Sequence, residues 1–116
     1  MKTIIAGSRT IRDMNTVTKA IMDSGFSITT VVSGMAAGVD SLAVQYAIAN
    51  GIEYIAMPAD WSQGRGAGYR RNEQMAEVAD ALIAVWDGIS RGTMHMINIA
   101  RKRGLKVYVH MLNNEG

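Results

Sequence analysis

Two short glycine-bearing segments contain the residues best suited to hold an anion. Residues 33–40 read SGMAAGVD and lie between a β-branched run and a segment with helical periodicity. Residues 87–93 read DGISRGT and also follow an apolar run and precede a helical pattern. A small-residue turn that leads from a strand into a helix presents free backbone N–H groups at the positive end of the helix dipole. Both segments are therefore predicted to hold a phosphate or another anion.

A third turn and a set of arginines strengthen this prediction. The turn Gly7-Ser8-Arg9 follows the first apolar run, and eight of the twelve basic residues are arginine, a side chain suited to bidentate phosphate contacts. In an open parallel sheet, the turns that follow the strands share one edge, where the ligand crevice lies. The arginines expected near that crevice are Arg9, Arg70, Arg71 and Arg91.

The elements that must position these turns alternate along the whole chain. Strands are expected over residues 3–6, 28–32, 52–57, 81–86 and 105–111, and helices over 14–24, 39–50, 70–79 and about 93–103. Thr93 is expected at the start of the last helix as a cap or a phosphate ligand, and Gly104 at its end as the C-cap. This order predicts one α/β domain over residues 1–116, with a parallel sheet covered by helices on both faces.

The composition excludes several classes of protein. Hydrophobic residues make up 48% of the 116 residues, which excludes a disordered chain. The absence of cysteine excludes disulfides, thiolate metal sites and a cysteine nucleophile, and favours a cytoplasmic location. No apolar run approaches the ~20 residues of a membrane span, so no membrane partner is expected. The net charge of +2 is low for a nucleic-acid binder. In addition, the basic residues 101–103 (RKR) are expected at the edge of the sheet opposite to the crevice.

Other side chains near the turns leave several kinds of chemistry open. Asp40, Asp87 and Glu73 are candidate catalytic carboxylates, although the two aspartates are equally suited to cap a helix or a turn. Trp61 is the better candidate for stacking on a base, because Trp86 ends a strand that is expected to be buried. The two histidines form no metal set or catalytic triad with any other residue of the sequence, and no metal or other cofactor is expected.

Four motifs together resemble the SLOG superfamily, and most closely its small, single-domain YspA-like branch. They are GSR at 7–9, SGMAAGVDSLA at 33–43, YRRNEQM at 69–75 and WDGISRGT at 86–93. The superfamily also contains DprA, a DNA-processing protein, and the LOG phosphoribohydrolases. The resemblance implies a Rossmann-like, doubly wound sheet of about five parallel strands, a possible homodimer, and a nucleotide-type ligand held at the glycine-bearing turns.

The resemblance also assigns residues to the site. Together with the arginines above, the ligand-binding candidates are Gly7, Ser8, Arg9, Ser33, Gly34, Gly38, Asp40, Arg71, Asn72, Ser90, Arg91, Gly92 and Thr93. LOG hydrolases have a glutamate three residues after the glycine–threonine pair, and this chain has Met96 there. The usual carboxylate of glycosidic cleavage is therefore missing, and whether the chain is an enzyme stays open.

Three functions follow from these observations. The first is the sensing or sequestration of a nucleotide or a nucleotide-derived ligand, such as an ADP-ribose or NAD-related molecule. The second is a LOG-like nucleotide-processing hydrolase that uses another carboxylate in place of the missing glutamate. The third, which the low charge makes less favoured, is single-stranded DNA binding of the DprA kind.

Overall fold

The computed structural model describes residues 1–112, which form five strands, four α-helices and one short 3-10 helix. The strands are β1 (Lys2–Gly7), β2 (Thr30–Ser33), β3 (Glu53–Ala56), β4 (Ala81–Trp86) and β5 (Lys106–Met111). The helices are α1 (Met14–Ser24), α2 (Val39–Ala49), the 3-10 helix η1 (Trp61–Gln63), α3 (Ala67–Val78) and α4 (Arg91–Lys102). Strands and helices alternate, as the sequence predicts.

The five strands form one parallel sheet in the order β3-β2-β1-β4-β5. The chain moves outward from β1 through β2 to β3 and then returns to the other side of β1 with β4. The strand order therefore reverses between β1 and β4. This is a doubly wound, Rossmann-like sheet, and it confirms the predicted fold class.

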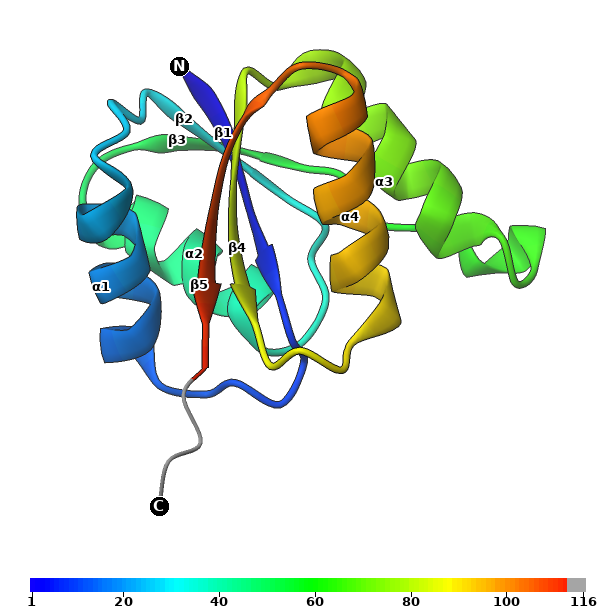
Figure 1. Cartoon of the computed structure of the whole chain (residues 1–116), viewed down its shortest axis with the longest axis horizontal. Coiled ribbons are helices and arrows are strands. Elements are labelled where there is room, and N and C mark those ends of the chain that lie inside the picture. The colour runs from blue at the N-terminus through cyan, green and yellow to red at the C-terminus, as the bar shows by residue number, and fades with distance from the viewer. Residues whose placement is uncertain (113–116) are drawn as a thin grey trace.

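Helices cover both faces of the sheet. Helices α1 and α2 bury residues such as Val17 and Ala43 against one face, and α3 and α4 bury Met75 and Ile97 against the other (Figure 1). Neighbouring residues of β1 alternate between these two cores, so that Ile5 faces the first and Ile4 the second. The central strands β2, β1 and β4 are apolar because the sheet is buried on both sides there, whereas the edge strand β3 is exposed.

Local signals mark both ends of α1. Asp13 is the N-cap of α1 and accepts a hydrogen bond from the backbone N–H of Asn15, and Gly25 ends the helix with a left-handed φ of 69°. At the end of α4 the C-cap is Arg103, and the positive φ belongs to the next residue, Gly104, so the predicted C-cap is off by one. No helix within residues 1–112 has the length and apolar character needed to span a membrane.

The largest difference from the sequence prediction is the start of α3. The helix begins at Ala67, three residues before the predicted residue 70, and η1 precedes it. A glycine-rich segment carries no apolar periodicity, so the sequence did not indicate this extra turn. The earlier start places Gly68 and Tyr69 on the helix, which matters for the site below.

Candidate functional site

A cavity of about 440 Å³ lies at the carboxyl edge of the sheet, beside the point where the strand order reverses. This volume falls in the range of small-molecule sites. The three turns that follow β1, β2 and β4 contribute to its wall, together with η1, α3 and the start of α4. Its lining residues are Ala6, Gly7, Ser8, Arg9, Thr10, Ala36, Asp40, Trp61, Arg65, Gly68, Tyr69, Arg71, Asn72, Met75, Asp87, Ile89, Ser90, Gly92, Thr93 and Met96.

The turns after β1 and β4 are joined to each other by hydrogen bonds. The backbone N–H of Ser8 donates to the Val85 carbonyl (3.1 Å), and the N–H of Asp87 donates to Ser8 Oγ (3.1 Å). A Cβ atom on Gly7 would collide with the Val85 carbonyl, so this close approach requires glycine. The two turns are therefore joined by hydrogen bonds into one continuous part of the cavity wall.

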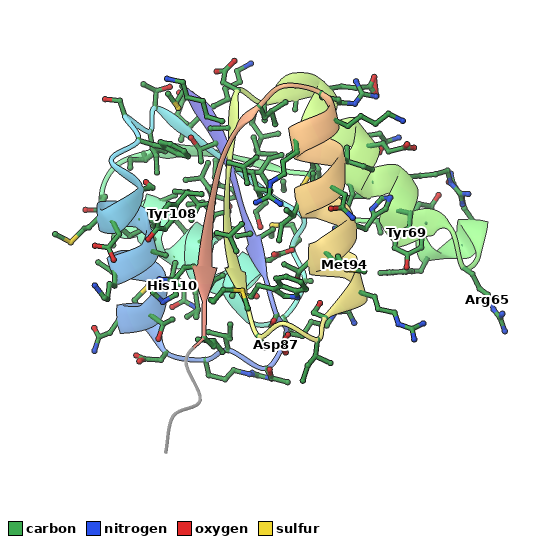
Figure 2. The ribbon with its side chains drawn as sticks, in the orientation of Figure 1. Arg65, Tyr69, Asp87, Met94, Tyr108 and His110 are labelled. Carbon is green, nitrogen blue, oxygen red and sulfur yellow. The ribbon has the colours of Figure 1, made fainter. Side chains whose placement is uncertain are left out.

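Asp87 stabilises the turn after β4. Its Oδ1 accepts hydrogen bonds from the backbone N–H groups of Ser90 (2.9 Å) and Ile89 (2.8 Å), and these bonds lower the pKa of the Asp87 carboxyl. Asp87 is therefore ionised at neutral pH, and its Oδ1 is already engaged in hydrogen bonds to the turn. Figure 2 shows it at the lower end of the sheet, where the chain leaves β4.

Ser90 rather than Thr93 is the N-cap of α4. Its Oγ accepts the backbone N–H of Thr93 and lies 3.0 Å from Thr93 Oγ1. The predicted capping role of Thr93 is therefore wrong, because its hydroxyl bonds to the cap instead. Between these two residues, Gly92 is exposed, and a Cβ atom there would meet no atom within 4 Å. The first turn of α4 thus leaves open space beside its N-terminus.

Asp40 is buried in the first turn of α2 and faces the cavity. Its Oδ2 accepts a hydrogen bond from the backbone N–H of Ala36 (3.2 Å), which holds the turn after β2 against the helix. Burial raises the pKa of Asp40 from its ordinary 3.8 to about 6, although the nearby Arg71 and Arg9 lower it. A carboxyl with a perturbed pKa in a cavity is a frequent mark of a functional site.

Arg71 is half-buried and donates to three acceptor oxygens. Its Nη1 donates to the carbonyl oxygens of Gly34 and Met57, which directly follow β2 and β3, and its Nε donates to Asn72 Oδ1 (3.2 Å). Nη2 takes no part in these bonds. A guanidinium fixed in this way needs little reordering to bind an anion, and a Cβ atom on Gly34 would displace it.

A cluster that the sequence did not indicate lies on the other side of Arg71. Asn72 is buried, and its Nδ2 donates to the Gly92 carbonyl (3.2 Å) and to Nδ1 of His95 (3.1 Å), which therefore acts as an acceptor. The rings of His95 and Tyr69 lie 4.3 Å apart, centroid to centroid. Burial lowers the pKa of His95, so its ring stays neutral at physiological pH.

The structure brings most, but not all, of the predicted site residues to the cavity. Ser33 is buried beside it, where its Oγ donates to the Asp40 carbonyl (3.1 Å) and accepts the N–H of Met35 (3.1 Å). Gly38 packs on the backbone of Ser8 with a φ of 79°. Ser33 and Gly38 therefore support the turn rather than line the cavity. Trp86 also lies outside the cavity, and its Nε1 donates to the Ser90 carbonyl.

Three charged candidates lie away from the cavity wall. Arg70 is exposed and donates to the side chain and the carbonyl of Gln63. Arg91 and Glu73 are also exposed, and neither lines the cavity. The expectation that Arg70 and Arg91 face the crevice is therefore wrong, because the periodicity of α3 and α4 turns both side chains outward.

Two aromatic residues form the outer part of the cavity. Trp61 of η1 is 59% exposed and Tyr69 of α3 is 48% exposed, and both line the wall. Trp61 was expected from the loop composition, whereas Tyr69 was not, because the helix was predicted to begin after it. Figure 2 shows Tyr69 on α3 and Arg65 extending from the segment that connects η1 to α3.

Within the described residues, no three His, Cys, Asp or Glu side chains are grouped closely enough to hold a metal ion. The cavity instead combines three arginines, two carboxylates, free space at a helix N-terminus and two exposed rings. This combination suits a ligand that carries both an anionic group and a planar group.

The fold is shared with two solved structures. The chain superposes on DNA processing protein A (DprA) from Streptococcus pneumoniae with a TM-score of 0.74 and 19% identity, covering 93% of this chain and 49% of that one. DprA from Helicobacter pylori, whose structure concerns its binding of single-stranded DNA, gives a TM-score of 0.64 and 20% identity, covering 99% of this chain and 67% of that one. The chain thus spans about half of the first protein and two thirds of the second.

A search of curated protein sequences finds no match. Residues 1–64, which are more than half of the chain, match the model of the family described as YspA, cpYpsA-related SLOG family. This segment includes the turns after β1 and β2, which contribute to the cavity wall, and the DprA structures share the fold of nearly the whole chain. The chain therefore belongs to the YspA-related SLOG family.

Proposed function

We propose that the protein binds a nucleotide or a nucleotide-derived ligand in this cavity, in order to sense or sequester it. The observation that carries the proposal is the fixed guanidinium of Arg71, which lines the 440 Å³ cavity and is held by the carbonyls of Gly34 and Met57. Burial lowers the pKa of Arg71, and Arg9, which lines the same cavity, lowers it further. Two nearby cations favour a ligand with a phosphate.

The outer part of the cavity supports the nucleotide class. The exposed rings of Trp61 and Tyr69 offer apolar surface to a planar base, and the guanidinium of Arg9 lies 6.0 Å from the Trp61 ring centroid. Gly92 leaves room for a phosphate at the N-terminus of α4. An anion alone would need only the arginines, so the aromatic wall favours a ligand with a base.

The test is isothermal titration calorimetry with AMP, comparing Arg71→Ala with Arg70→Ala. The two arginines are adjacent, but only Arg71 lines the cavity, so Arg70→Ala is a matched control for charge. We expect Arg71→Ala to weaken binding by about 1.5–3 kcal/mol, the contribution of a charged hydrogen bond. We expect Arg70→Ala to bind as the unmodified protein does, and both variants to unfold cooperatively.

Equal losses in the two variants would indicate general charge attraction instead of a site. Wild-type affinity in Arg71→Ala would remove this side chain from the proposed site. Absence of measurable binding by AMP, ADP and ADP-ribose alike would contradict the nucleotide proposal itself.

The shared fold with the DprA structures supports a second candidate, single-stranded DNA binding. A DNA strand needs several phosphate contacts, and each contact contributes about −0.7 to the slope of log affinity against log salt. The basic residues of this chain are divided, since Arg9 and Arg71 lie at the carboxyl edge of the sheet and residues 101–103 end α4 at the other edge. This division favours a small ligand over a continuous strand.

A titration of a labelled thirty-base oligonucleotide at several salt concentrations distinguishes the two candidates. We expect weak binding that fades near physiological salt, together with a shallow slope for the best nucleotide. Tight oligonucleotide binding with a steep slope that Arg71→Ala reduces would favour the DNA-binding function instead.

A further inference from the structure

The side chain of Asn72 connects Arg71 to the first turns of α4. Helices α3 and α4 lie side by side on one face of the sheet (Figure 1), and Asn72 is a buried residue of α3. Its Oδ1 accepts the Nε–H of Arg71, and its Nδ2 donates to the Gly92 carbonyl and to His95 Nδ1. The oxygen and both N–H groups of the amide are therefore engaged at once.

The partners of this amide leave it a single orientation. The Nε–H of Arg71 can only donate, so it must face the amide oxygen, and the Gly92 carbonyl can only accept, so it must face the amide nitrogen. The remaining N–H of Asn72 then points at His95 Nδ1, which must accept it. His95 is therefore neutral in this network and carries its proton on Nε2.

Protonation of His95 removes this acceptor. Its Nδ1–H would face an N–H of Asn72, so two donors would meet and neither would have a partner. Turning the amide over does not relieve the conflict, because its nitrogen would then face the Arg71 Nε–H and its oxygen the Gly92 carbonyl. The amide must leave its place, and the Nε of Arg71 loses its acceptor with it.

The groups around His95 favour the neutral ring. Tyr69, three residues before Asn72 on α3, packs its ring against the imidazole at 4.3 Å between centroids. Burial lowers the pKa of His95 from its ordinary 6.5, and Glu73, also on α3, opposes this shift. On α4, the exposed Arg91 lies one turn before His95. The imidazole is therefore neutral near pH 7 and titrates on the acid side of 6.5.

We propose that His95 is a positioning residue for Arg71. As a neutral acceptor it fixes Asn72, and Asn72 fixes the Nε side of the guanidinium. Protonation of the imidazole breaks this chain and leaves Arg71 attached through Nη1 alone, so that its plane can turn. The effect on ligand affinity rests on the proposed function, whereas the positioning is a property of the ligand-free protein and can be tested there.

Nuclear magnetic resonance of the ¹⁵N-labelled, ligand-free protein at pH 7.5 tests the positioning role. The imidazole signals are expected to show His95 protonated on Nε2 only. His95→Asn places an oxygen where Nδ1 stood, so the Nε–H of Arg71 is expected to exchange with water as slowly as in the unmodified protein. His95→Phe keeps a ring beside Tyr69 but offers no acceptor, and is expected to speed this exchange about three- to tenfold, the equivalent of one hydrogen bond.

The pH dependence separates this role from a merely structural contact. The rate of Arg71 Nε–H exchange in the unmodified protein, divided by the rate in His95→Asn, is expected to rise about three- to tenfold as His95 titrates between pH 7.5 and 5. Asp40, whose pKa of about 6 places it in the same range, is present in both proteins, so its contribution cancels. His110→Asn, which removes the other histidine of the chain from β5, is the matched control and is expected to behave as the unmodified protein does.

Calorimetric titration with AMP extends the test to the proposed function. The affinity of the unmodified protein, divided by that of His95→Asn, is expected to fall about three- to tenfold between pH 7.5 and 5. Protonation of the AMP phosphate affects both proteins alike and cancels in this ratio. If the exchange measurements agree with the proposal while AMP binds at neither pH, only the proposed function is contradicted.

The remaining outcomes decide the positioning role. Equally slow exchange in His95→Phe and in the unmodified protein at pH 7.5 would overturn it, and His95→Leu takes the place of His95→Phe if that variant does not fold. A ratio that stays constant while His95 titrates, or an imidazole that stays neutral down to pH 5, would overturn the release by protonation. In the Asn72→Ala background, His95→Phe is expected to have no further effect, and a full additional effect would mean that His95 does not act through Asn72.

Discussion

Replacing Asp40 with asparagine is expected to remove a pH-dependent cost of keeping a carboxylate buried. Asp40 is 5% exposed in the first turn of α2, and burial is the main cause of its raised pKa. Asparagine has nearly the same shape and keeps an oxygen that can accept the Ala36 N–H. The substitution therefore changes the charge of the site while leaving its packing and its hydrogen bond in place.

The magnitude follows from the pKa. In the unfolded chain Asp40 titrates near 3.8, and in the folded protein near 6, so the folded state holds the proton more tightly between these values. Stability therefore falls as pH rises through this window, and at 1.36 kcal/mol per pKa unit the loss amounts to about 3 kcal/mol above pH 6. Asparagine does not titrate, so Asp40→Asn avoids this loss.

The assay is urea unfolding of both proteins at a series of pH values from about 4 to about 8. The quantity of interest is the free energy of unfolding of Asp40→Asn minus that of the unmodified protein. Groups that titrate in both proteins, such as His95, cancel in this difference. We expect the difference to grow by about 2.4 kcal/mol in favour of the variant as pH rises from 4 to 7, and to be level at higher pH.

A difference that stays constant across this range would refute the reasoning, because it would mean that Asp40 titrates alike in the folded and unfolded states. A difference that grows in the opposite direction would mean that Arg71 and Arg9 outweigh burial, and that the pKa of Asp40 is lowered.

Three further predictions concern the turns and the chemistry of the site. Gly7→Ala places a Cβ against the Val85 carbonyl and is expected to lower the free energy of unfolding by about 1–3 kcal/mol, measured by urea unfolding; unchanged stability would contradict the close contact between the two turns. Gly92→Leu meets open space in a helix and is expected to preserve or raise the melting temperature in calorimetry while it blocks the cavity; a large fall in melting temperature would show that the space is filled. Nucleoside monophosphates are expected to release no free base in a chromatographic assay, because glycosidic cleavage needs a carboxylate and Met96 occupies the expected position; steady release that Asp40→Asn abolishes would favour the hydrolase instead.

The sequence was sufficient to predict the arrangement that creates the site. Apolar runs and caps such as Asp13 locate the elements, and the parallel sheet then brings the turns after β1, β2 and β4 to one edge. This inference needs only the alternation of strands and helices, which local composition determines. For this reason Gly7, Asp40 and Gly92 were correctly expected to be near one another.

The sequence could not distinguish neighbouring residues of the same type. Arg70 and Arg71 are adjacent, and only the register of α3 against the ends of β2 and β3 decides that Arg71 faces the cavity. The early start of α3, which brings Tyr69 to the wall beside His95, depends on packing between α3 and α4. Contacts between distant segments of the chain leave no periodic signal in either segment.

A nuclear magnetic resonance titration of the ¹⁵N-labelled protein with AMP tests the central claim most directly, because each backbone amide reports its own surroundings. A ligand in the cavity is predicted to shift the amides of residues 8–9, 34–36 and 90–93, which lie at the carboxyl edge of the sheet, and to leave residues 101–104 at the far end of α4 unchanged. Shifts confined to residues 101–104, or no saturable shifts at all, would contradict a nucleotide site at this edge.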